Sequence, residues 1–289
     1  MTGLHRLLPT VALVLTQCIL PTIAVPLTAG EDTQTFLTDT SASSPYHPEQ
    51  DADTIHTENA EAQRAPSWFT STLMARRLLA LSTTGVASTI FPQDPPENAR
   101  TPPEVAGQSI SLKEYISDCD AALPADISEG GNGDPTFLAL HVATTFRNTA
   151  AGSNISLSLD WWDHLNDTEP LFPGFPLSPA GLPRVTLFGH IEEFPAPLSR
   201  ETESALQACY LDAHPDARVW LPGRPHSPHA SFWARMVVTQ VYWIGGFGGF
   251  QQIGWMNVSE WKGVRREASL PGIGDGRGWA DVRLPGEKD

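Results

Sequence analysis

The sequence predicts a mostly β domain in which antiparallel strands are flanked by helices. Short runs rich in Val, Ile, Leu and aromatic residues recur between positions 81 and 257. Two of these runs alternate apolar with polar residues, which is the period of a half-buried strand. Helical spacing of apolar residues is limited to two segments, 66–81 and 199–213. The order helix, several strands, helix and final strand pair therefore predicts mostly antiparallel β structure with helices packed on it.

The first expected elements are a helix over 66–81 and a strand over 81–91. The helix has an apolar face whose members recur at helical spacing: Phe69, Leu73, Met74, Leu78, Ala80 and Leu81. The segment 92–107 follows, and its prolines exclude both a helix and a central strand. It is therefore expected to be a long loop.

Three strands are expected in the middle of the chain. The run 137–146 is almost continuously apolar. In 155–161 every second residue is apolar, from Ile155 to Trp161, with serine or aspartate between them. The run 184–191 alternates again, with Val185 and Leu187 on one side. Both alternating runs have the strand period of two.

The C-terminal half begins with a helix that Ser199 can cap and that His214 and Pro215 end. The run 232–244 is dense in aromatic and branched residues and has neither glycine nor proline, so it is expected to be a long strand. The run 251–257 is expected to be its returning partner. Between them lie four glycines that allow a tight turn or the close approach of a ligand: Gly245, Gly246, Gly248 and Gly249. The structural turn is favoured, since no cluster of cations accompanies the glycines.

The two ends of the chain differ in composition from its centre. Residues 1–24 hold one cation, Arg6, before an apolar run, which is typical of a secretory signal peptide; a membrane anchor is disfavoured by Pro9, Gln17 and Pro21. Residues 25–63 are acidic and rich in Ser and Thr, which predicts disorder. The expected domain covers 64–264, and 265–289 is expected to be a flexible tail. No further run can span a bilayer, so stable membrane insertion is not expected.

Charge and cysteines restrict the environment and the partners. Without residues 1–24 the chain has 17 basic and 33 acidic residues, a net charge of −16, which disfavours nucleic acid. It would suit an acidic lumen, but composition does not separate secretion from delivery to a vacuole or lysosome. Outside the expected signal peptide lie Cys119 and Cys209, which permit one disulfide; the alternative is a buried helical thiol and a loop thiol.

Three sequons, at Asn154, Asn166 and Asn257, are candidate N-glycan acceptors in a secreted chain, or else unmodified asparagines. His226 and His229, with His214 nearby, invite a metal interpretation. No cysteine or paired carboxylate completes a zinc set at a familiar spacing, so no metal is expected. Signatures of nucleotide loops, nucleophile elbows and redox Cys pairs are absent from the sequence, and no catalytic residue is assigned.

Several of these segments together resemble one family. The motif HPDA at 214–217, the proline-rich loop after it, the aromatic strand 232–244 and the glycine turn are similar to the pyridoxamine 5′-phosphate oxidase-like split β-barrels, and most closely to their CREG-like branch. The earlier segments ARRLLALSTTGVASTIF, AGQSISLKEYISDCD and FLALHVATTFRNTAAGSNISLSL match the same order of elements. The resemblance covers residues 66–264 and implies a split β-barrel with flanking helices.

The resemblance has consequences for cofactor and function. Flavin-using members carry a compact Arg/Lys cluster within and just after neighbouring strands. The cations available to this core do not form such a cluster in sequence: Arg76, Arg77, Arg147, Arg184 and Arg235. CREG-type members are regarded as lacking FMN, with a cleft that the protein's own loop tends to block, and segment 92–107 is a candidate for that loop.

Two functions are therefore carried forward. The first is a secreted or vacuolar/lysosomal glycoprotein without enzymatic activity or cofactor, which forms a homodimer and binds a protein or a glycan-dependent receptor. The dimer is expected because strand 232–244 is apolar on both faces. The alternative is an FMN-dependent oxidoreductase, which the fold alone suggests.

Overall fold

The structure is a computed structural model and describes residues 65–95, 100–124, 127, 132–170, 176–247, 249–264 and 282–288. The expected signal peptide (1–24), the expected disordered segment (25–63) and Gly248 lie outside these ranges. All described residues belong to one compact unit of the chain. Within the described ranges, no helix combines the length and the apolar character that crossing a membrane requires.

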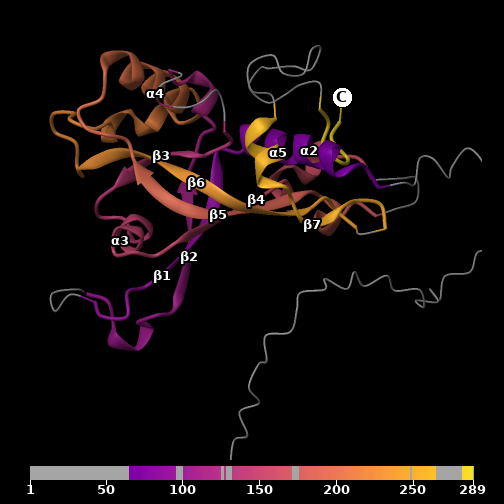
Figure 1. Cartoon of the computed structure of the whole chain (residues 1–289), viewed down its shortest axis with the longest axis horizontal. Coiled ribbons are helices and arrows are strands. Elements are labelled where there is room, and N and C mark those ends of the chain that lie inside the picture. Colours follow the sequence, from indigo (N-terminus) through magenta and orange to yellow (C-terminus); the bar gives the residue numbers. More distant parts are fainter. Residues whose placement is uncertain are drawn as a thin grey trace, which may run out of the picture. The chain divides into compact units, whose positions relative to one another are not determined.

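One antiparallel sheet organises the described residues (Figure 1). Its strands are β1 (Thr84–Ile90), β2 (Ser109–Tyr115), β3 (Thr136–Leu140), β4 (Ile155–Asp160), β5 (Arg184–Glu193), β6 (Ser231–Ile244) and β7 (Ile253–Trp255). Their order is β2-β1-β4-β5-β6-β3, with β7 also paired to β6. The mostly β fold with flanking helices is therefore confirmed.

The two end strands of this order meet. Just after β2, Ser117 pairs with Thr136 at the start of β3 through two backbone N–H to carbonyl hydrogen bonds of 3.1 and 2.8 Å. This bridge curls the sheet so that its ends come together, which is the arrangement of a barrel.

The main core lies on one face of the sheet, because apolar residues alternate with polar ones along β1, β4 and β5. Leu157 of β4, Leu187 of β5 and Trp243 of β6 are fully buried there. Helix α2 (Trp68–Leu81) adds Leu78 and Leu79 to this core. Each such side chain contributes about 1.5–3 kcal/mol of hydrophobic stabilisation.

A β-bulge decides which residues of β6 face the core. The register between β5 and β6 shifts at Phe188 and Gly189, and a Cβ at Gly189 would lie 2.0 Å from the carbonyl oxygen of Val237. Beyond the bulge the core-facing parity changes, so that Val238 and Val241 both reach the main core.

This bulge corrects the expectation that strand 232–244 needs a partner to cover its two faces. Met236 and Val238 are buried in the main core, and Trp243 joins them beyond the bulge. On the other face, Trp233 is buried in a second cluster against α4 (Arg200–Ala213). These side chains are therefore covered within the chain and do not require a partner.

Helix α4 begins and ends where the sequence predicts. Ser199 Oγ accepts a 3.1 Å hydrogen bond from the backbone N–H of Thr202, and the helix stops at Ala213, before His214 and Pro215. A disulfide between Cys209 of this helix and Cys119 ties it to the segment after β2, with a Cα separation of 5.8 Å. Of the two alternatives left open for these cysteines, the structure has the disulfide.

The strand expected over 137–146 is wrong in its second half. β3 ends at Leu140, and α3 (Thr144–Ala150) follows. His141 and Val142 are exposed at the turn, and Phe146 folds back to meet Phe137 edge-to-face at 5.6 Å between ring centroids. The apolar run therefore contributes side chains to the core from two elements, first from β3 and then from α3.

The C-terminal elements also differ from expectation. The returning strand is only β7, and Asn257 caps a short helix, α5 (Val258–Gly263), by accepting a 3.1 Å hydrogen bond from Glu260 N–H. Residues 282–288, which were expected to belong to a flexible tail, pack on the domain: Val282 and Leu284 are buried. β2, to which no strand was assigned from the sequence, forms the edge beside β1.

Candidate functional site

A cavity of about 160 Å³ lies between β2, β3, α3, α4 and the 3₁₀ helix Pro215–Trp220. It is the hollow that combines an apolar lining with a partly buried ionisable group. Its lining residues are Lys113, Glu114, Tyr115, Leu138, Leu140, Ala143, Phe146, Tyr210, Ala217 and Trp220.

The local folds of these elements bring the lining together. Leu138 and Leu140 lie on one face of β3 because strand residues two apart share a face. Phe146 comes from α3, the helix that replaces the expected end of this strand. Tyr210 is buried on α4, and its hydroxyl donates a 3.1 Å hydrogen bond to the carbonyl oxygen of Tyr115. This bond fixes α4 against the end of β2.

Glu114 is the acidic group of the cavity. Its carboxylate accepts a short hydrogen bond from the hydroxyl of Thr145, at the start of α3. Burial raises the pKa of Glu114, and the hydrogen bond from Thr145 opposes that rise. The side chain is thus a partly desolvated acid held in one orientation.

The rim of the cavity is tied to the HPDA motif. The ring of His214 is buried, stacks on Tyr115 at 4.4 Å between centroids, and makes a 2.8 Å hydrogen bond through Nε2 with the carbonyl oxygen of Ile116. Tyr115 Oη donates to Asp216 Oδ2 at 3.2 Å, which raises the pKa of the tyrosine. The motif therefore orders the end of β2 and adds a carboxylate beside the cavity.

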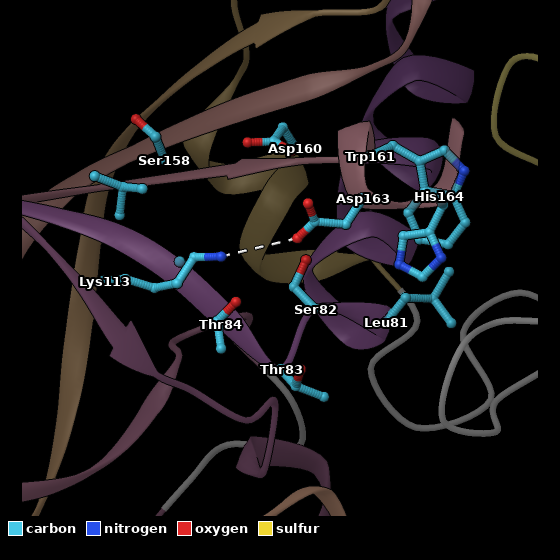
Figure 2. Close-up of a pocket in the computed structure, with 12 residues that line it drawn as sticks. Leu81, Ser82, Thr83, Thr84, Lys113, Ser158, Asp160, Trp161, Asp163 and His164 are labelled. Atoms are coloured by element: carbon cyan, nitrogen blue, oxygen red, sulfur yellow. Dashed lines mark ion pairs between the residues drawn. The ribbon is translucent and has the colours of Figure 1, made fainter. Parts of the chain in front are cut away.

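A second, polar hollow of about 90 Å³ is lined by residues of β1, β2 and β4 and of the segment that follows β4 (Figure 2). Lys113 Nζ points across it toward Asp163 Oδ2 at 3.8 Å, and His164 stacks on Trp161 at 3.8 Å between centroids. Both charged side chains of the pair are mostly exposed, so the pair contributes little stability.

A third hollow is a groove of about 530 Å³ on the outer face of β1, β4, β5 and β6. Its lining includes the polar residues Ser88, Ser156, Thr239 and Asn154 and the aromatic residue Phe188. No lysine or arginine lines this groove.

The arginines that the sequence offered to a flavin phosphate are mostly engaged elsewhere. Arg76 is buried and donates a 2.7 Å hydrogen bond to the carbonyl oxygen of Trp261. Arg77, also buried, forms an ion pair with Glu287 of the C-terminal segment. These two cations therefore fasten α2 to the C-terminal elements, and the structure does not bring them to a common site.

The other three arginines are dispersed as well. Arg235 donates to the carbonyl oxygen of Ile127 at 2.8 Å and to Glu192 at 3.1 Å. Arg184 lies over the ring of Trp162. Arg147 is exposed on α3. None of the three lines any of the three hollows described above.

The histidines do not converge on a metal. His226 and His229 are exposed, and His226 has a positive φ of 63° in a loop, whereas His214 is buried against Tyr115. Among the described residues no group of His, Cys, Asp and Glu side chains is arranged to hold a metal ion.

The glycine turn connects β6 to β7. Gly245 N–H donates a 3.0 Å hydrogen bond to the carbonyl oxygen of Gln252. Gly246 has a φ of +137°, and a Cβ there would lie 2.7 Å from the backbone oxygen of Gly181. At Gly249 a Cβ would meet nothing within 4 Å. Gly246 thus requires glycine for backbone reasons, which supports the structural interpretation of the turn.

All three sequon asparagines are exposed. Asn154 precedes β4, Asn166 lies in the 3₁₀ segment Trp162–Asp167, and Asn257 caps α5. Exposure makes each accessible as an acceptor, and glycosylation of each stays a prediction.

The described part of segment 92–107 forms the connection between β1 and β2, and Phe91 and Gly107 continue the ladder through a 3.1 Å hydrogen bond. The described residues of this segment, 92–95 and 100–107, line none of the three hollows. The suggested role of this segment in blocking a ligand cleft stays a prediction.

Sequence reasoning missed a pair of buried carboxylates beside the disulfide. Asp120 is fully buried, and Asp134 is nearly so. Asp134 N–H donates to Asp120 Oδ2 at 3.3 Å, Val238 N–H donates to Asp134 Oδ1 at 2.7 Å, and Lys262 Nζ lies 3.5 Å from Asp134 Oδ2. Burial, followed by the charges of Asp134 and Asp118, raises the pKa of Asp120 to about 7. Only the run of acids around Cys119 hinted at this cluster.

A curled antiparallel sheet with helices packed on it and a small cavity beside its edge strand defines a helix-flanked β-barrel domain. A family model described as "CREG, beta-barrel" matches residues 68–262, and the chain belongs to this family. The resemblance stated from the motifs is therefore confirmed. A search of curated protein sequences finds no match.

Solved structures with a similar arrangement are distant in sequence. A heme binding protein from Mycobacterium smegmatis is 18% identical with a TM-score of 0.45, covering 69% of this chain and 62% of that protein. A protein of unknown function from Agrobacterium tumefaciens is 19% identical with a TM-score of 0.40, covering 68% and 64%. The heme storage protein HutZ from Vibrio cholerae is 9% identical with a TM-score of 0.36, covering 60% and 94%. The chain spans less than two thirds of the first two proteins.

Proposed function

We propose that this CREG-family barrel is a secreted or vacuolar/lysosomal glycoprotein that uses no FMN, catalyses no reaction, and acts as a homodimer that binds a protein or glycan-dependent receptor. The signal-like residues 1–24 and the exposed sequons support the compartment and the glycans.

The dispersal of the arginines carries the proposal that no flavin is bound. An FMN phosphate needs convergent cations or backbone amides, and the ring needs a flat apolar slot. Arg76 and Arg77 are buried in contacts with Trp261 and Glu287. The cavity beside Glu114 is well below the about 300–1,000 Å³ of pockets that hold larger ligands, and the groove of about 530 Å³, which is within that range, has no lysine or arginine in its lining.

Charge in that cavity acts against FMN as well. Glu114 lines it, and Asp216 accepts a hydrogen bond from the hydroxyl of Tyr115, another lining residue. The negative charges of these two carboxylates would repel the negatively charged phosphate of FMN in a partly desolvated site. The residues of this chain therefore do not fit the flavin that the superfamily implies, and no redox step is assigned to them.

An apolar patch on the outer face of the sheet is the observation that supports a homodimer. It takes the place of the two faces of β6, which are buried within the chain. Trp255 of β7 lies 5.5 Å from Phe188 and 5.0 Å from Tyr242 between ring centroids. Trp255 is 47% exposed and Ile253, on the same face, is 39% exposed. Phe188 also borders the large groove, so the apolar surface is continuous with a hollow. A contiguous exposed patch of this kind is typical of an interface.

An absorbance spectrum of the purified full chain tests the cofactor part, and light scattering tests the dimer part. We expect neither a flavin nor a heme band, and a dimer mass after correction for glycans. Trp255→Ser should weaken the dimer, whereas Trp162→Ser, at a similarly exposed tryptophan outside the patch, should not. A stoichiometric flavin band, or a monomer at micromolar concentration, would contradict the corresponding part.

A further inference from the structure

Glu114 brings a negative charge to a mostly apolar cavity whose lining contains one cation, Lys113. Its one hydrogen bond among the described residues comes from the hydroxyl of Thr145, and none of the ion pairs between described residues includes it. A partly desolvated carboxylate is costly unless it is protonated or meets a positive charge. The carboxylate of Glu114 is therefore the point in the cavity at which a cationic ligand would be stabilised.

The neighbouring lysine does not supply that charge. Lys113 and Glu114 are consecutive in β2, so their side chains leave the strand on opposite faces. Lys113 directs its ammonium group toward Asp163 across the polar hollow, as Figure 2 shows. Asp216 adds a second carboxylate, which accepts a hydrogen bond from the hydroxyl of Tyr115. With Lys113 directed toward Asp163, the carboxylate of Glu114 has no ion-pair partner of its own in the cavity.

Aromatic residues make up much of the remaining lining. Phe146, Tyr210 and Trp220 come from three different elements and line the cavity, and Tyr115, whose ring stacks on His214, also lines it. Aromatic rings attract cations through their quadrupole and, unlike water, also favour methyl groups. Aromatic rings together with a carboxylate are a combination that recognises methylated ammonium ions.

The volume restricts the size of the ligand. The cavity of about 160 Å³ holds the equivalent of about five water molecules. A trimethylammonium group with a short alcohol or alkyl chain is of this order, whereas a nucleotide is too large. Leu138 and Leu140 provide the apolar wall against which such a chain can lie.

We propose that this cavity is a binding site for a small organic ammonium ion, with Glu114 as its counter-charge and the aromatic lining as its cage. The site is separate from the proposed dimer face, and the inference does not rest on the proposed function. The protein can lack FMN and dimerise without binding an ammonium ion. It can equally bind an ammonium ion although it carries FMN or is a monomer.

Titration calorimetry of the full glycosylated chain tests the site, with choline chloride as the probe. The matched probe is 3,3-dimethyl-1-butanol, which has the same shape with carbon in place of the charged nitrogen. The measurement is made at slightly alkaline pH, because burial raises the pKa of Glu114 and a higher pH favours its carboxylate form. We expect choline to bind at least about tenfold more tightly than the alcohol, because only the cation gains from the carboxylate and the rings.

Three variants assign the effect to the cavity. Glu114→Gln and Trp220→Leu should each weaken choline binding at least about tenfold, while Glu104→Gln, at an exposed acid that lines none of the hollows, should bind as the wild type does. Thermal melts confirm that each variant is folded. Equal affinity for choline and the alcohol, unchanged binding by Glu114→Gln, or no heat and no rise in melting temperature with millimolar choline would each overturn the proposal.

Discussion

Replacing Asp120 by asparagine should change how the stability of this protein depends on pH. Asp120 is fully buried beside the disulfide, and Asp134 N–H donates to its Oδ2. Burial and the nearby carboxylates raise its pKa to about 7, whereas in an unfolded chain an aspartate has a pKa of about 3.9. The folded protein therefore holds a proton on Asp120 that the unfolded chain releases between these two values.

The sign and size of the effect follow from this difference. Because the folded pKa is the higher one, the stabilisation is complete below about pH 4 and is lost as the pH rises through about 7. A difference of about three pKa units corresponds to about 4 kcal/mol of unfolding free energy, at about 1.4 kcal/mol per unit. The asparagine side chain resembles the protonated acid in shape and does not titrate, so the substitution removes this contribution.

Urea unfolding of both proteins from acid to slightly alkaline pH measures the contribution. The variant and the wild type should be similarly stable near pH 4. Above about pH 7 the variant should be the more stable by about 4 kcal/mol. Asp94→Asn, at an exposed acid, serves as the control and should follow the wild type at every pH. If the curve of Asp120→Asn also parallels that of the wild type, Asp120 has the same pKa in the folded and the unfolded protein and the reasoning is wrong.

Three further changes test other parts of the structure. Replacing Cys119 and Cys209 by alanine opens a loop of 90 residues and should lower the unfolding free energy by about 4–5 kcal/mol; urea midpoints equal to those of the native protein would contradict this. Gly246→Val should destabilise the fold by about 1–3 kcal/mol because of its positive φ, while Gly249→Val should be tolerated; similar melting temperatures for the two variants would refute the backbone argument. Asn154→Gln should remove one glycan step on a gel, and an unshifted band from normally secreted protein would show that the site is unused.

Local signals in the sequence predicted much of the fold. Ser199 and the pair His214-Pro215 fix the two ends of α4 through backbone chemistry that needs no tertiary information. The strict alternation after Asn154 likewise predicted β4, whose core face is set by the period of two. The order of such elements was sufficient to indicate the family.

Other features depend on contacts between distant segments, and the sequence did not reveal them. The apolar run 137–146 satisfies both strand and helix requirements, and only the packing of Phe146 on Phe137 divides it at His141. The bulge at Gly189 reverses the faces of β6, which no periodicity of β6 alone can show. The cavity beside Glu114 likewise depends on contacts between distant segments. Glu114 gains its environment from α3 and α4, which are remote from β2 in sequence.

The central claim is that this CREG-family barrel works without a flavin, and titration of FMN into the full chain by calorimetry tests it most directly. We expect no saturable heat with FMN and no oxidation of pyridoxamine 5′-phosphate when FMN is supplied, since Arg76 and Arg77 are committed to Trp261 and Glu287. Tight binding of one FMN per chain would contradict the claim.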